Sequence, residues 1–68
     1  MNSPAERIAQ TVKLSRPAQR ALAAAGVVTY ADLENWTRQQ VAQLHGVGPK
    51  TFVVLEPAMK ARGVDFKP

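Results

Sequence analysis

The residues of this 68-residue chain best suited to chemistry are six consecutive ones, Gly46-Val47-Gly48-Pro49-Lys50-Thr51. Glycine lets the backbone adopt positive φ angles and approach a ligand closely, so Gly46 and Gly48 predict a tight bend. Pro49 is typical of the first residue of a helix, whose dipole then presents its positive end to the bend. We expect the amides of Gly46, Gly48 and Lys50 to converge on one oxyanion, such as a phosphate.

The side chains around this bend favour a binding role over a simple connection. Val47 is expected to enter the core, while Lys50 and Thr51 provide an amine and a hydroxyl in the first helical turn. A bend that only joins two helices has no use for a donor-rich turn that faces solvent. The alternative is that Gly46 and Gly48 form only a turn, as in SAM-like domains that bind proteins.

The elements that position the bend are predicted to be four or five short helices. Capping residues predict where these helices start, and glycines predict where they end. The first helix is expected over 4–13, opened by Ser3 and Glu6, and the second over 16–25, capped by Ser15 and ended by Gly26. A short helix follows Thr29 and Asp32, a fourth is opened by Thr37 and Gln40 and ended by Gly46, and the last covers 49–62 and is ended by Gly63. Pro57 is expected to kink or break the last helix.

Apolar residues at helical spacing predict the inward faces of these helices. They are Ile8 and Val12, then Ala18, Ala21, Leu22 and Ala25, then Leu33, Val41 and Leu44, and finally Phe52, Leu55 and Met59. Trp36 is expected in the core, whereas His45 is assigned no role in binding. The sequence thus predicts one all-α domain, 1–68, with an N-terminal helix within 1–13 and a short tail at 65–68.

Composition narrows the function classes. The chain has no Cys and one His, so neither a disulfide nor a zinc site is expected, and we expect no cofactor. We find no membrane span and no signal peptide, and therefore expect a cytoplasmic protein with no membrane partner. Nine Lys and Arg against five Asp and Glu give a net charge of +4, which favours a polyanionic partner.

The pattern from Leu44 to Thr51 resembles the helix-hairpin-helix motif of DNA repair and replication proteins. A wider similarity, from Leu14 to Val64, is to the C-terminal domain of the bacterial RNA polymerase α subunit and its free-standing relatives. The resemblance implies a SAM-like or paired helix-hairpin-helix fold with a face that enters the DNA minor groove. It assigns a backbone amide contact to Gly48, a phosphate-pairing amine to Lys50 and a hydroxyl contact to Thr51.

The sequence departs from that family at the start of the second helix. Pro17 stands where the family inserts an arginine into the minor groove, and Arg20 stands where it has an asparagine. We therefore expect little sequence specificity. Arg16 and Arg20, one helical turn apart, are expected to supply phosphate contacts instead.

A catalytic alternative follows from the similarity of the same bend to that of base-excision glycosylases, in which the Lys attacks a sugar. Lys50 would then be the nucleophile. Those enzymes also need an Asp further along and a second helical domain that forms a base pocket, and Asp65 lies too near. We expect a DNA-binding module, not an enzyme, with no small-molecule substrate; the alternative is a protein-interaction module in transcription or repair.

Overall fold

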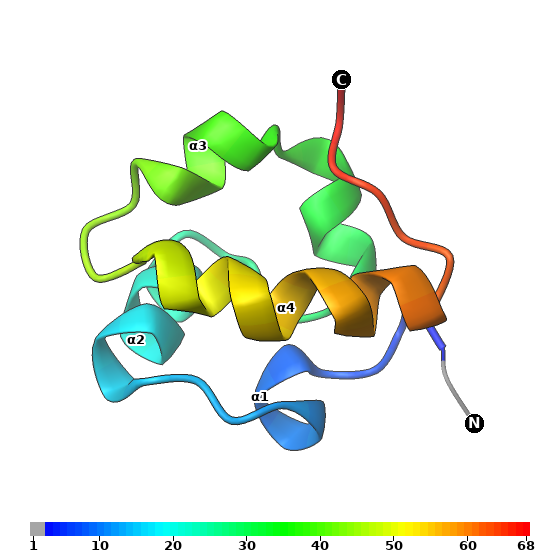
Figure 1. Ribbon diagram of the computed structural model, residues 1–68, viewed down its shortest axis with the longest axis horizontal. Coiled ribbons are helices and arrows are strands. Elements are labelled where there is room, and N and C mark those ends of the chain that lie inside the picture. Colours follow the sequence, from blue (N-terminus) through cyan, green and yellow to red (C-terminus); the bar gives the residue numbers. More distant parts are fainter. Residues whose placement is uncertain (1–2) are drawn as a thin grey trace.

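The computed structural model describes residues 3–68, which form short helices joined by turns, and no strand occurs among them (Figure 1). The elements are α1 (Ile8–Thr11), α2 (Arg16–Ala24), the 3-10 helix η1 (Ala31–Asn35), α3 (Arg38–Ala42) and α4 (Pro49–Ala61). The all-α class expected from the sequence is confirmed for these residues. Within 3–68, none of the helices combines the length and apolar character that crossing a bilayer requires.

The N-terminal segment differs from the expected helix over residues 4–13. The Ser3–Glu6 capping interaction forms, since the Ser3 amide donates to Glu6 Oε1 at 2.7 Å, but it closes only a turn. The chain then pairs with a distant segment: the amide of Ile8 donates to the Val28 carbonyl at 3.0 Å, and Arg7 forms an isolated antiparallel bridge with Thr29. This pairing withdraws the backbone from helical hydrogen bonding, so α1 begins only at Ile8.

The caps predicted for the next helices are present. Ser15 Oγ accepts from the Ala18 amide at 3.3 Å, and Gly26 follows α2 with a φ of 81°. Thr37 and Gln40 form a complete capping box at the start of α3. Because these signals act over three or four residues, the sequence located the starts of both helices closely. The end of α3 differs from the expected stop at Gly46: the helix ends at Ala42, and the Leu44 amide then donates to the Val41 carbonyl, only three residues back.

Asp32 holds the start of η1. Its Oδ2 accepts from the amides of Thr29 and Val28, both at 2.9 Å, while its own amide donates to Thr29 Oγ1 at 3.3 Å. Hydrogen bonds from the Thr29 and Val28 amides lower the pKa of Asp32 from its ordinary value of 3.8. The side chain therefore fixes this turn best when it is ionised.

Helix α4 is the longest element and crosses the middle of the molecule (Figure 1). It runs without a break from Pro49 through Pro57, so the break allowed for at Pro57 does not occur. The sequence prediction that Gly63 stops this helix is confirmed by its φ of 67°, and Val64 folds back into the core. Both ends of α4 are therefore fixed.

One hydrophobic core joins all of the helices. Its buried residues are Ile8, Leu14, Ala18, Leu22, Val27, Tyr30, Leu33, Val41, Phe52, Leu55, Met59 and Val64. Val12, Ala25, Trp36, Leu44, Val47 and Phe66 pack against it and are partly buried. The tail expected at 65–68 is thus partly packed, since Phe66 joins the core and the Lys67 amide donates to the Trp36 carbonyl at 2.8 Å.

Arg62 fastens the end of α4 to the N-terminal segment. Its Nε lies 3.1 Å from Glu6 Oε1, its Nη1 donates to the Ala58 carbonyl at 2.8 Å, and its guanidinium lies 4.3 Å from the centroid of the Tyr30 ring. The pKa of Glu6 is lowered from 4.5, first by the Ser3 amide and then by the charge of Arg62. Residues from opposite ends of the chain are joined in this way.

Candidate nucleic-acid interface

The bend predicted between α3 and α4 is present at residues 43–48. Gly46 adopts a φ of 101°, which reverses the chain after α3. Val47 packs against the core, as expected, and its amide donates to the Leu44 carbonyl at 3.1 Å. The bend is therefore held from the inside, and its outer backbone faces solvent.

Four amides in the bend and just after it donate no hydrogen bond to any residue within 3–68: those of His45, Gly46, Gly48 and Lys50. Gly46 and Lys50 are exposed and Gly48 is partly exposed. The first amides of a helix have no carbonyl one turn back to bond, and they lie at the positive end of the dipole of a 13-residue helix. The bend can thus donate several hydrogen bonds to an anion.

The two glycines serve different purposes, contrary to the expectation that both allow positive φ. Gly48 has φ −118° and ψ 178°, an extended conformation open to any residue. A Cβ on Gly48 would meet nothing within 4 Å, so neither the backbone nor internal packing requires glycine there. What the missing side chain provides is open space in front of the first turn of α4.

The bend lies against the first turn of α2. A Cβ on Gly46 would lie 2.6 Å from the Pro17 carbonyl oxygen, so the two backbones are in direct contact. Arg16 and Arg20 of that turn are both exposed. The residues assigned to the site from 46–50 and from α2 are therefore neighbours, on the left side of the molecule as drawn in Figure 1.

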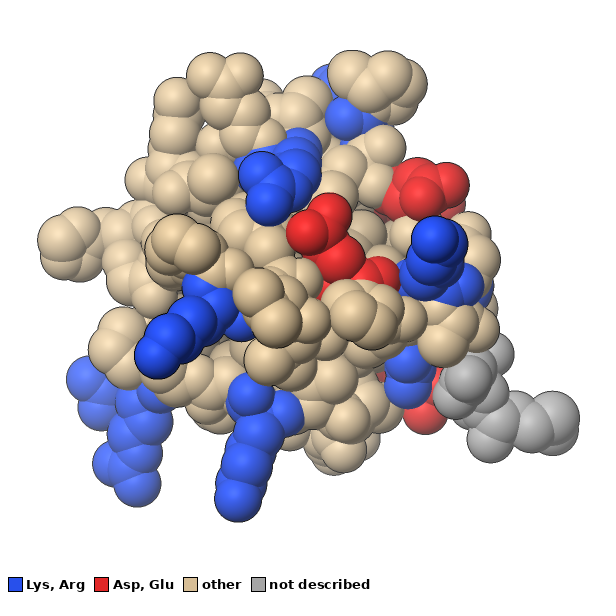
Figure 2. Space-filling model, viewed as in Figure 1, with Lys and Arg blue, Asp and Glu red and all other residues tan. Residues whose placement is uncertain are grey.

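Basic side chains gather on the same side. Figure 2 shows Lys and Arg projecting at the lower left, where α2 and the start of α4 lie, with no acidic side chain among them in this view. Toward the right of the figure both signs of charge occur. The net charge of +4 is thus distributed unevenly, with its purely basic part beside the bend.

Thr51 was expected to face solvent, but the structure buries it. It is only 6% exposed, whereas Lys50 beside it is exposed. Successive residues of a helix point about 100° apart, so a turn that directs Lys50 outward directs Thr51 toward the core, on the face that also buries Leu55. Lys50 remains the one solvent-facing donor side chain of the predicted pair.

Arg38 belongs to the surroundings of the bend, although the sequence did not indicate it. Its guanidinium lies 4.3 Å from the centroid of the Phe52 ring and 3.5 Å from Glu56 Oε2. Together with Val47, Gly48 and other neighbours it lines a hollow of about 240 Å³. Because Arg38 and Phe52 are far apart in the sequence, no local spacing predicts their contact.

Within residues 3–68, no group of three or more His, Asp or Glu side chains lies close enough together to hold a metal ion. His45 is exposed next to the bend, and Trp36 packs partly buried against the core. Comparison of the chain with protein-family models, with curated proteins and with solved structures finds no match.

Proposed function

We propose that this domain binds the phosphate backbone of duplex DNA at the Gly46–Lys50 bend, in the manner of a helix-hairpin-helix module. The observation that carries the proposal is the set of free amides of Gly46, Gly48 and Lys50 next to the open space at Gly48. Backbone amides at the start of a helix are well suited to phosphate oxygens. The α3–bend–α4 unit and its contact with α2 support a paired helix-hairpin-helix arrangement.

Each residue has a distinct part in the proposed contact. The Gly48 and Lys50 amides donate to a phosphate oxygen, and the absent side chain of Gly48 lets the sugar–phosphate chain come close. Lys50 adds its charge from the first turn of α4, and Arg16 and Arg20 pair with a neighbouring phosphate from α2. Thr51 supports this turn through its packing, because it is buried.

Contacts of this kind determine how the domain binds. Phosphate contacts position a protein on DNA without reading its sequence, so little sequence preference is expected. A module with so few contacts should have a Kd of about a micromolar or weaker at physiological salt, and its affinity should fall steeply as salt rises. We infer that such a protein works in the compartment that holds DNA, which agrees with the cytoplasmic location expected from the sequence. In this proposal the domain binds DNA and catalyses no reaction.

The test is a titration of ¹⁵N-labelled protein with a short DNA duplex at low salt. We expect the amide signals of Gly46, Gly48 and Lys50 to shift first and furthest. Lys50→Glu should weaken binding about tenfold and reduce the slope of log K against log salt by about one. Lys60→Glu is the matched control, since it makes the same charge change on an exposed residue near the other end of α4.

Two results would refute the proposal. One is a set of shifts that leaves the bend unchanged at saturating duplex. The other is an equal loss of affinity in the Lys50 and Lys60 variants, because binding would then follow net charge and not the position of the bend.

A further inference from the structure

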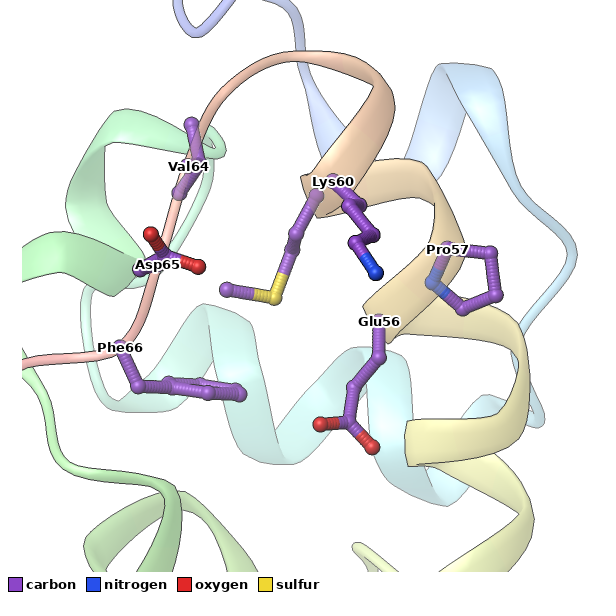
Figure 3. Close-up of a pocket in the computed structure, with 7 residues that line it drawn as sticks. Glu56, Pro57, Lys60, Val64, Asp65 and Phe66 are labelled. Atoms are coloured by element: carbon purple, nitrogen blue, oxygen red, sulfur yellow. The ribbon is translucent and has the colours of Figure 1, made fainter.

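A groove of about 520 Å³ lies between the second half of α4 and the segment that follows the helix (Figure 3). Its base is apolar: Met59 is 3% and Val64 2% exposed. Phe66 closes one side and is itself held edge-on against Phe52, with the ring centroids 6.0 Å apart. The groove is therefore formed by fixed residues and can receive a bulky apolar side chain.

The mouth of the groove carries two carboxylates and one amine. In Figure 3 the side chains of Glu56, Lys60 and Asp65 stand around it. Asp65 forms no ion pair with any residue of the described range, and the side chain of Glu56, though paired with Arg38, is 48% exposed. The groove is thus locally acidic, by one charge, on a chain whose net charge is +4.

The backbone beside the groove has free hydrogen-bonding groups. The Val64 amide donates to the Met59 carbonyl at 2.9 Å and the Lys67 amide to Trp36, but the amides of Asp65 and Phe66 donate to no acceptor within 3–68. This segment belongs to no helix or turn. Successive amides of an extended segment point to opposite sides, so one of these two can donate to a carbonyl of an extended peptide in the groove.

We propose that this groove docks a short cationic segment of a partner protein, with one bulky apolar side chain flanked by Lys or Arg. The apolar side chain lies on Met59 and Val64, the flanking cations meet Glu56 and Asp65, and a peptide carbonyl accepts a hydrogen bond from one of the two free amides. A pocket of this size suits one or two side chains. The two carboxylates disfavour a nucleic acid here, because they repel phosphate.

This docking site is independent of the DNA contact proposed above. The α4 residues that line the groove, from Glu56 to Lys60, lie six to ten residues beyond Lys50, or about 9–15 Å along the helix axis. Both ends of the helix can therefore be occupied at the same time.

The experiment titrates ¹⁵N-labelled full chain with the peptide acetyl-Ala-Lys-Phe-Arg-Ala-amide. We expect saturable shifts at Asp65, Phe66 and Lys60, with Gly48 unchanged. Two control peptides test the chemistry: one replaces Phe by Ser, and the other replaces both cations by Glu. Neither should bind comparably.

Replacing an acidic or a basic residue of the groove should change the affinity for the peptide in opposite directions. Asp65→Lys should weaken peptide binding about fivefold, and Lys60→Gln should strengthen it about twofold, because surface charges contribute modest energies. Glu34→Lys, an exposed acidic residue of η1 outside the groove, is the matched control and should change nothing. The proposal is overturned if no groove amide shifts at millimolar peptide, if the acidic peptide binds equally, or if Glu34→Lys weakens binding as much as Asp65→Lys.

Discussion

Replacing Gly46 by alanine should destabilise the whole fold. At a φ of 101° an L side chain is strained by about 1–2 kcal/mol. The new Cβ would also lie 2.6 Å from the oxygen and 2.9 Å from the carbon of the Pro17 carbonyl, which are backbone atoms that cannot rotate away. Overpacking of this kind costs about 1–3 kcal/mol. A total of about 2–5 kcal/mol is a large part of the stability of a domain this small, about 3–10 kcal/mol.

Urea unfolding followed by circular dichroism measures this loss, and Gly48→Ala is the matched control. Alanine fits the backbone angles of Gly48 and meets no atom within 4 Å, so its cost is limited to that of a poorer N-cap, below about 1 kcal/mol. The same variant should nevertheless weaken DNA binding, because its methyl group occupies the space left for a phosphate. If Gly46→Ala unfolds at the same urea concentration as the natural chain, the contact between the bend and α2 is wrong.

Three other perturbations test separate parts of the structure. Arg62→Met removes a hydrogen bond from a charged group and a cation–π contact, so unfolding experiments should show a loss of about 2–3 kcal/mol; an unchanged midpoint would mean that the clamp contributes nothing. Because the pKa values of Glu6 and Asp32 are lowered in the folded state, their ionised side chains stabilise the fold at pH values above the ordinary pKa values of 4.5 and 3.8. This stabilisation should be lost as the pH falls through the lower pKa values of the folded state. Urea midpoints measured down to acidic pH should therefore fall less steeply in Glu6→Gln plus Asp32→Asn, and an identical profile would contradict the assignment. Arg16→Ala plus Arg20→Ala should weaken duplex binding at low salt while leaving the bend as the main site of amide shifts, and unchanged affinity would exclude α2 from the interface.

The sequence predicted those features that depend on neighbouring residues. The Ser15 and Thr37 caps each form within three residues, and Gly26 and Gly63 need only their own φ angles to end a helix. The bend at Gly46 belongs to the same class. Local rules of this kind place α2, α4 and the start of α3 without knowledge of the rest of the chain.

Features that depend on distant contacts were missed. Residues 4–7 carry helix-start signals, yet the amides of Tyr30 and Ala31 donate to the carbonyls of Glu6 and Pro4 at 3.3 and 2.8 Å. Those carbonyls are therefore not available to a helix, and no spacing within the first residues reveals it. The contact of Arg38 with Phe52 is hidden for the same reason.

Part of the candidate site could also not be predicted from the sequence. Lys50 and Thr51 are adjacent donors in the sequence, and only the rotation of α4 about its axis decides which of them faces solvent. That rotation is set by the burial of Phe52, Leu55 and Met59 together. Once the helix is anchored by these residues, Thr51 turns inward, and the charged side of the bend is limited to Lys50 and α2.

Because α4 carries both proposed sites, the coupling between them follows from how the helix is held. Val47 packs against the core at one end, and Arg62 and Gly63 fix the other, so neither ligand has a second helix position to select. The remaining link is electrostatic, and a separation of about 9–15 Å along α4 exceeds the Debye length of about 8 Å at physiological salt. Saturation with the cationic peptide should therefore leave the Kd for duplex DNA unchanged at that salt and lower it only at low salt. A coupling that persists at high salt would mean that α4 moves as a body, which its anchored ends do not allow.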